Sequence, residues 1–187
     1  MRTLTYGMNL TLDGFIAAPG GDIGWSEPSD ELFEWWLEQE QGIDVFLYGR
    51  KLWENMNAYW PTGDEQPGAT PAHVAFAQNW RDTPKVVFST TLSEVEGNAR
   101  LVTSDAAAEI ARLKAQDGGR MRVAGASLGG VALRAGLVDE LEVVTHPVLI
   151  GGGAPFFPSL DRWVQFDLLE TRTFAGGVVL SRYAVRR

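Results

Sequence analysis

Residues 122–141 constrain the fold of this chain more than any other stretch, because their pattern passes from strand to helix and back to strand. An apolar strand comes first, and the small residues Gly125, Ala126 and Ser127 then predict a tight turn. A helix and the opening of a second strand follow. Strands that alternate with helices in this way are typical of a sheet that is largely parallel and covered on both faces.

The same alternation continues along the rest of the chain. The periodicity predicts strands at residues 3–12, 45–48, 85–89, 100–103 and 121–124. It predicts helices at residues 30–42, 52–59, 71–80, 106–116 (capped by Ser104) and 128–135. Long loops are expected at residues 12–25, which return over the first strand, and at 63–70. Residues 141–150 and 166–185 predict at least three further strands, the last two pairing around Gly176 and Gly177, so the expected α/β sheet ends in antiparallel strands.

Composition bounds the class of protein. We expect residues 1–187 to form a single domain, because this length is sufficient for one sizeable core. The chain has no cysteine, so neither disulfides nor a cysteine-based metal site is expected. No apolar run approaches the ~20 residues that span a membrane, and the N-terminus enters a strand pattern directly, which predicts a cytoplasmic protein. The formal net charge of −8 argues against a nucleic-acid partner but permits a small anionic ligand.

Three predicted strand ends carry small or polar residues that suit a phosphorylated ligand. Ligands of open α/β sheets bind outside the carboxyl ends of strands. A small-residue turn lets the backbone approach a pyrophosphate, and the helix start behind it offers unpaired N–H groups. Cations would neutralise a phosphate and hydroxyls would donate to it. The three groups are Gly49–Arg50–Lys51, Ser89–Thr90–Thr91 and Gly125–Ala126–Ser127–Leu128.

Each group also has a purely structural interpretation. Arg50 and Lys51 could be surface charges, but cations at a helix start oppose the helix dipole, which favours an anionic ligand. Ser89 and Thr90 fit an ordinary strand-to-turn transition equally well. Gly125 could serve a tight turn alone. It is the occurrence of all three groups in one order that predicts a dinucleotide site.

Several motifs together resemble a known family. They are residues 11–17 (TLDGFIA), 48–51 (YGRK), 86–91 (VVFSTT), 123–127 (VAGAS), 136–140 (GLVDE) and 146–153 (HPVLIGGG). In this order they resemble the dihydrofolate reductase-like superfamily, in the branch of the C-terminal reductase domain of the riboflavin-pathway deaminase–reductase. The resemblance covers essentially the whole chain and implies a three-layer α/β fold with a mixed, mostly parallel central sheet. It also implies a homodimer.

The resemblance implies an NADPH-dependent reductase of a planar heterocycle, pyrimidine-like or pterin-like. By position, Gly49, Arg50 and Lys51 match the phosphate-binding helix start, and Ser89 and Thr90 the segment near the adenosine 2′-phosphate. Gly125, Ala126, Ser127 and Leu128 match the pyrophosphate turn, and Ile16 and Ala17 the segment beside the nicotinamide. Trp25 matches a tryptophan of the mobile loop in dihydrofolate reductases, and Asp30 is nearest to their substrate-binding carboxylate. Trp25 and Trp53 are candidate walls of the substrate pocket, and Asp30 is the candidate catalytic residue.

Two departures from the family pattern leave other functions open. Ala124 stands where riboflavin-pathway reductases typically have an acidic residue, and residues 53–57 (WENMN) replace their Asp-(Asn/Asp)-Pro segment. One alternative is therefore a non-catalytic nucleotide-binding homodimer that keeps the fold, and another is an α/β enzyme for a phosphorylated metabolite. Asp30 fits a helix N-terminus equally well. His73 and His146 are interpreted as a surface residue and a structural residue.

Overall fold

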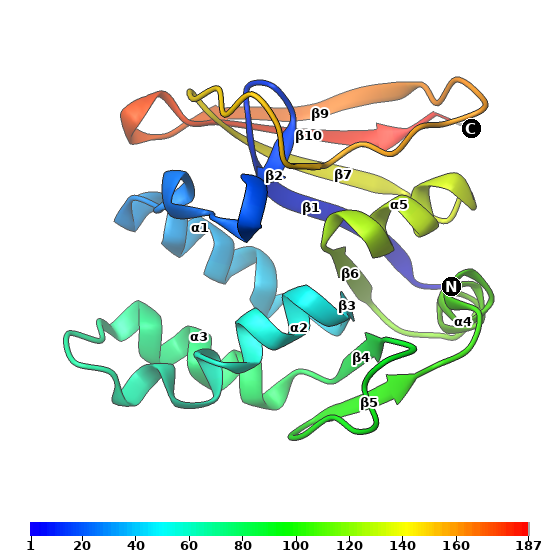
Figure 1. Ribbon diagram of the computed structural model, residues 1–187, viewed down its shortest axis with the longest axis horizontal. Coiled ribbons are helices and arrows are strands. Elements are labelled where there is room, and N and C mark those ends of the chain that lie inside the picture. The colour runs from blue at the N-terminus through cyan, green and yellow to red at the C-terminus, as the bar shows by residue number, and fades with distance from the viewer. Residues whose placement is uncertain (187) are drawn as a thin grey trace.

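The computed structural model describes residues 1–186 and is built around one mixed sheet (Figure 1). The eight strands lie in the order β5-β4-β3-β6-β1-β7-β10-β9. All pairings from β5 to β7 are parallel, whereas β10 runs antiparallel to β7 and to β9. The bounds are β1 Thr3–Thr11, β3 Ile43–Gly49, β4 Lys85–Phe88, β5 Ala99–Val102, β6 Arg120–Ala124, β7 Glu140–His146, β9 Phe166–Thr173 and β10 Val179–Val185.

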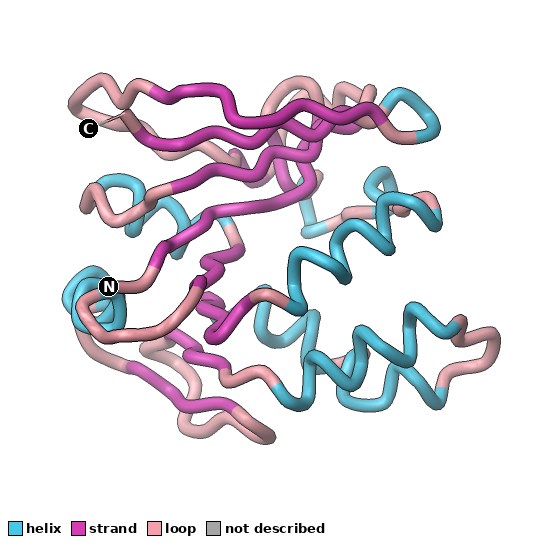
Figure 2. The backbone as a smooth tube through the Cα atoms, turned by 180° about the vertical axis from the view of Figure 1, so that it is seen from behind, coloured by secondary structure: helices cyan, strands magenta, loops and turns pink. Residues whose placement is uncertain are grey.

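Helices cover both faces of this sheet (Figures 1 and 2). They are α1 Asp30–Gln41, α2 Arg50–Asn57, α3 Pro71–Asp82, α4 Ala106–Lys114 and α5 Ala126–Arg134. On one face, Trp53 of α2 packs with Trp80 of α3 and Phe46 of β3. On the other, Ile110 of α4 and Leu128 of α5 share the largest hydrophobic cluster. The sequence-based prediction of a mostly parallel, doubly covered α/β sheet with antiparallel C-terminal strands is therefore confirmed.

Several boundaries differ from the sequence-based expectation, each for a local reason. Asp105, not Ser104, caps α4, because its carboxylate accepts hydrogen bonds from two N–H groups of the first turn. The helices predicted from residues 52 and 128 begin two residues earlier, at Arg50 and Ala126, directly after the strands. Residues 12–25 are not all loop, because Phe15–Ala17 forms β2, which pairs with β8 (Ala154–Pro155).

The strand predicted to reach residue 150 ends at His146, so residues 147–150 form a loop. Pro147 has no N–H to continue the hydrogen-bonded ladder between strands. The side chain of Asp13 then binds the backbone of the loop that follows. The Asp13 carboxylate accepts from the N–H groups of Ile150 at 3.1 Å and Gly151 at 2.8 Å. A hydrogen bond from the Thr11 hydroxyl, followed by these backbone bonds, lowers the pKa of Asp13, so its charge is part of the loop anchor.

Candidate active site

The chain leaves the sheet toward opposite faces at two neighbouring strands, β3 and β6. These strands are parallel and paired, with Tyr48 opposite Ala124 at their carboxyl ends. From β3 the chain enters α2 on the face that carries α3, whereas from β6 it enters α5 on the face that carries α4. A crevice outside the strand ends forms where the connections diverge in this way, and it is the usual ligand site of open α/β sheets.

The starts of α2 and α5 lie against each other beside these strand ends. A Cβ built on Gly125 would lie 3.6 Å from Leu52 Cβ of α2, and one built on Gly49 would lie 3.8 Å from Leu128 Cβ of α5. Neither helix has a side-chain cap, so the N–H groups of both first turns are left for solvent or a ligand. Two uncapped helix N-termini side by side make a strong anion-binding position.

Gly125 is required by the backbone at this turn. Its φ of 90° and ψ of 134° lie in a region that side-chain-bearing residues rarely adopt. Its N–H donates to the sulfur of Met8 in β1 at 3.3 Å, which fixes the turn against the neighbouring strand. Ala126 is half-buried and Ser127 is exposed, whereas the Leu128 side chain is buried, so only its backbone could contact a ligand.

Arg50 and Lys51 are both exposed at the start of α2. The Arg50 guanidinium pairs with Glu54 one turn later at 3.1 Å. Glu54 partly offsets the unfavourable interaction of the Arg50 charge with the helix dipole. An exposed ion pair of this kind is weak and opens readily to solvent. Arg50 is therefore not committed to its structural partner and can turn to an anionic ligand.

The segment after β4 lies beside the start of α2, because β4 and β3 are neighbours in the sheet. The Ser89 hydroxyl accepts from the N–H groups of Thr91 and Leu92, each at 3.1 Å, and so closes a turn. The structural interpretation therefore holds for Ser89 in this conformation. Thr90 is exposed and is the better placed hydroxyl for an external phosphate.

Ile16 and Ala17 lie on β2, the segment that follows β1 across the carboxyl edge. Both are half-buried, and Ile16 packs against the main core cluster. Gly153 approaches so closely that a Cβ there would come within 2.0 Å of the Ala17 carbonyl oxygen. The neighbouring strands β4, β3 and β6 thus lead into residues 89–90, 49–51 and 125–128, and the next strand, β1, leads into the loop that carries residues 16–17.

Trp25 lines a hollow beside the start of α1. This hollow, of about 570 Å³, lies at the carboxyl end of β7 between the start of α1 and the β9–β10 turn. The Trp25 ring meets the His146 ring edge-on at 5.3 Å, and burial lowers the pKa of His146, which favours its neutral form. Leu32 and Trp35 of α1 pack on Val144 of β7 and Leu180 of β10. The role of Trp25 at the substrate stays a prediction.

Asp30 is the first residue of α1 and is exposed. Ser29 caps the helix, and the negative charge of Asp30 interacts favourably with the positive N-terminal end of the helix dipole. Trp53 was expected at a pocket wall, but it is only 5% exposed and stacks on Trp80 at 5.9 Å. Trp53 is thus a core residue, because α3 covers the face of α2 that carries it.

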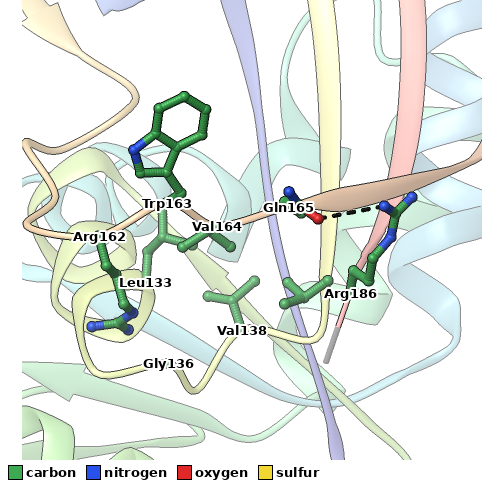
Figure 3. A pocket seen from close by; sticks show the side chains of 9 residues that line it. Leu133, Gly136, Val138, Arg162, Trp163, Val164, Gln165 and Arg186 are labelled. Carbon is green, nitrogen blue, oxygen red and sulfur yellow. Dashed lines mark hydrogen bonds between the residues drawn. The ribbon is translucent and has the colours of Figure 1, made fainter.

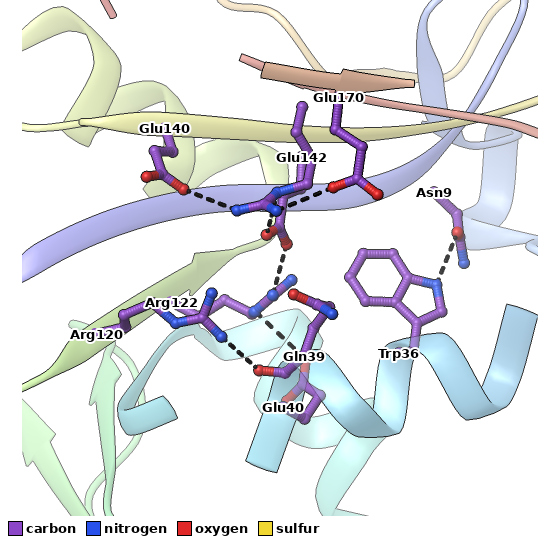
Figure 4. A network of polar contacts seen from close by, with 10 residues as sticks. Asn9, Trp36, Gln39, Glu40, Arg120, Arg122, Glu140, Glu142 and Glu170 are labelled. Atoms are coloured by element: carbon purple, nitrogen blue, oxygen red, sulfur yellow. Dashed lines mark hydrogen bonds and ion pairs between the residues drawn. The ribbon is translucent and has the colours of Figure 1, made fainter. Parts of the chain in front are cut away.

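Sequence reasoning missed the contact between Asn9 and Trp36. The Trp36 indole N–H donates to the Asn9 side-chain oxygen at 3.2 Å (Figure 4). The Arg122 guanidinium lies 5.2 Å from the centre of the Trp36 ring. An asparagine on an alternating strand and a tryptophan on a helix carry no sequence signal of this contact, which joins segments 27 positions apart.

A buried ionic network lies under α1 and was also missed (Figure 4). Arg122 of β6 donates to Glu142 of β7 at 2.5 Å, and Arg122 and Glu142 are 2% and 0% exposed. Glu40 at the end of α1 lies 3.5 Å from the Arg122 Nε atom. Burial raises the pKa of Glu40 to about 7, against the opposing effect of Arg122. Arg182 of β10 joins Glu142 to two further carboxylates, Glu140 and Glu170.

A second hollow, of about 400 Å³, lies at the end of the sheet opposite to the carboxyl ends of β3 and β6 (Figure 3). Leu133, Val138 and Trp163 are among its lining residues, and Trp163 is 94% exposed. Arg186 at its rim donates to Gln165 and pairs with Asp167. This hollow contains no residue of the segments 49–51 and 125–128, so it is separate from the helix starts that follow β3 and β6.

Comparison with known proteins agrees with this architecture. The family model of the RibD C-terminal domain matches residues 2–180. The uncharacterized protein YyaP of Bacillus subtilis (strain 168) is 32% identical over 183 residues, covering 95% of this chain and 92% of that protein. A Shewanella sp. PV-4 protein named for riboflavin biosynthesis has a TM-score of 0.78 at 21% identity, with 99% of both chains covered. Dihydrofolate reductase from Enterococcus faecalis, solved with NADP(H), has a TM-score of 0.63 at 17% identity, covering 99% of this chain and 97% of that one.

The fold is thus that of the dihydrofolate reductase-like proteins. Within them, the chain belongs to the RibD C-terminal domain family. Both assignments confirm the resemblance carried by the sequence motifs. No helix among residues 1–186 is long and apolar enough to cross a membrane.

Proposed function

We propose that this chain is an NADPH-dependent reductase of a planar heterocycle, formed by the whole chain as one domain and acting in the cytoplasm. The observation that carries the proposal is the pair of uncapped helix starts, α2 and α5, facing each other at the divergence of β3 and β6. Their N–H groups would hold the pyrophosphate. The family and the NADP(H)-bound state of the Enterococcus faecalis enzyme support the choice of ligand.

The other proposed contacts come from the segments that follow the carboxyl ends of β4, β3 and β1. Arg50, Lys51 and Thr90 would bind the adenosine 2′-phosphate, with Ser89 closing the turn behind them. Ile16 and Ala17 would lie along the nicotinamide and fix its distance from the substrate. NADPH, when bound, supplies a hydride, so the chain itself need only position the two rings and exclude water. That chemistry does not require a catalytic triad.

The first experiment compares NADPH and NADH in calorimetric titrations of the wild type and of Arg50→Ala. We expect the wild type to prefer NADPH, and Arg50→Ala to lose on the order of 1.5–3 kcal/mol of NADPH affinity with little change toward NADH. Arg100→Ala is a matched control, because Arg100 is a surface arginine on β5 that pairs with Glu109 at the sheet edge. Equal affinities of the wild type for both nucleotides would contradict the 2′-phosphate assignment.

The second experiment follows NADPH absorbance while pyrimidines and pterins are added one at a time. Oxidation of NADPH that depends on a heterocycle is the expected result. Tight NADPH binding with no oxidation by any ring would instead favour the non-catalytic nucleotide-binding domain. Failure to bind either nucleotide would remove both functions.

We also propose a homodimer formed through the free edge of the sheet. The edge strand β9 exposes two adjacent leucines, Leu168 at 58% and Leu169 at 52%. An exposed apolar edge strand is a surface that proteins normally cover or pair. Residues 147–150 form a loop, and Val178 and Leu180 are buried in the core, so neither segment offers an apolar strand to a second copy.

A further inference from the structure

The hollow of about 400 Å³ at the C-terminal end of α5 contains no residue that the proposed reductase uses. Its volume is in the usual range of small-molecule sites, ~300–1,000 Å³. Backbone hydrogen bonds hold its walls in place. The Val185 N–H donates to the Asp139 carbonyl at 2.8 Å, and the Arg186 N–H donates to the Gln165 carbonyl at the same distance. Because these walls are already ordered, a ligand would bind without a large loss of conformational entropy.

Most of the lining of this hollow is apolar. Leu133 and Val138 are 3% and 2% exposed, and Val164 and Val185 are half-buried. Trp163 lines the same hollow, yet it is 94% exposed. Aromatic rings pack favourably on one another, stacked or edge-on. A flat ring on the apolar lining would therefore also gain contact with the Trp163 indole.

The polar part of the lining is positively charged. Arg162 and Arg186 lie on opposite sides of Val138 in Figure 3, and none of the described residues that line the hollow is acidic. Arg186 already has a counter-charge, because its Nε and Nη2 atoms both donate to Asp167. The Arg162 Nη1 atom lies 3.7 Å from the exposed carboxylate of Asp161, which is beyond hydrogen-bond distance. The charge of Arg162 is therefore available to an anion.

The Arg162 guanidinium has a fixed direction. Its Nη2 atom donates to the Arg134 carbonyl in the last turn of α5, at 2.8 Å. Among the residues that the structure describes, Nη1 has no hydrogen-bond partner and can donate to a ligand. A guanidinium matches the planar geometry of a carboxylate. In a chain of net charge −8, a hollow lined by two arginines attracts an anion that the protein as a whole repels.

We propose that this hollow binds a planar aromatic carboxylate, with its rings on the apolar lining beside Trp163 and its carboxylate on Arg162. A neutral apolar ligand would cover the guanidinium without giving it a counter-charge, which costs free energy. A second copy packed here about a two-fold axis would bring its own Arg162 to the same face, so like charges oppose that occupant. The site is separate from the proposed nucleotide site and would be present whether or not the chain is a reductase.

The test compares two probes that share their rings and differ in charge. Naphthoate carries the carboxylate, and naphthamide carries a neutral amide in its place. Calorimetry without nucleotide should give an affinity for naphthoate that is about tenfold higher, the usual effect of a charge-assisted hydrogen bond. In proton–nitrogen NMR spectra, the indole signal of Trp163 should shift with naphthoate. The loss of one indole signal in Trp163→Phe assigns it.

Arg162→Gln removes the charge and keeps a polar side chain. It should lower the affinity for naphthoate about tenfold and leave the affinity for naphthamide unchanged. Arg112→Gln is the matched control, because Arg112 is an exposed arginine of α4 outside the hollow, and it should keep both wild-type affinities. Trp163→Ala should weaken the binding of both probes, since it removes the ring contact and not the charge.

Several results would overturn the proposal. Equal affinities of the wild type for the two probes would remove the charged contact, and so would an unchanged naphthoate affinity in Arg162→Gln. A wild type that does not bind naphthoate would remove the site. Sedimentation without a probe tests the second copy as occupant. We expect Trp163→Ala to keep the oligomeric state of the wild type, whereas a wild-type dimer that this change dissociates would make the hollow an interface between copies.

Discussion

Replacing Glu40 by glutamine should change how the stability of this protein depends on pH. Glu40 is 8% exposed at the end of α1, and burial raises the pKa of its carboxyl from the ordinary 4.5 to about 7. Three charged groups face it: Arg122 and Arg120 favour its ionised form, and Glu142 opposes it. The folded protein thus holds a proton on Glu40 in a range where the unfolded chain has lost it.

The sign of the effect follows from proton linkage. Between pH 4.5 and about 7 the folded state binds more protons at Glu40 than the unfolded state, so the free energy of unfolding falls as the pH rises. The difference between the two pKa values corresponds to on the order of 3 kcal/mol. Glutamine has nearly the same shape and does not titrate, so Glu40→Gln should lack this loss.

Urea unfolding followed by tryptophan fluorescence, repeated across this range, measures the slope. His146 acts in the opposite direction: burial lowers its pKa in the folded state, so its contribution to the free energy of unfolding grows as the pH rises. It is present in both proteins and cancels in the difference. Glu38→Gln, on the exposed side of the same helix, should keep the wild-type slope. Equal slopes for the wild type and Glu40→Gln would show that Glu40 does not cause the loss of stability with rising pH.

Three further changes test the nucleotide turn, the edge strand and the start of α1. Gly125→Val should abolish NADPH binding and cost about 1–3 kcal/mol of backbone strain, with circular dichroism showing a retained fold; unchanged affinity would reject the turn assignment. Leu168→Glu should give a monomer by light scattering where the wild type is a dimer, and a monomeric wild type would contradict the interface. Asp30→Asn should lower turnover without altering NADPH affinity if Asp30 acts on substrate; a loss of only about 0.3–1 kcal/mol in stability would assign it to the helix dipole.

The fold could be predicted from the sequence because each element carries its own periodicity and punctuation. The meeting of two helix starts was also predictable, since Gly49 ends β3, Gly125 follows β6, and parallel strands end at the same edge of a sheet. The positions of single aromatic residues could not be predicted in the same way. Trp53 on α2 could face either the crevice or the core, and only the packing of α3 decides this. Trp25 lies near the start of α1, but which flank it occupies depends on the β9–β10 turn.

The contacts of Asn9 could not be predicted because they depend on charges that meet only in the folded sheet. Arg122 and Glu142 lie on β6 and β7, which are separated by β1, and their side chains bridge that strand where it carries Gly7. A Cβ on Gly7 would come within 2.9 Å of the Arg122 Nη1 atom and 3.1 Å of Glu142 Cβ. A glycine in the middle of a strand weakens it, yet here it opens the space for the ion pair. The Arg122 side of that pair lies against Trp36, which in turn holds the carboxamide of Asn9, so a glycine in β1 and a buried ion pair together fix a side chain of the same strand.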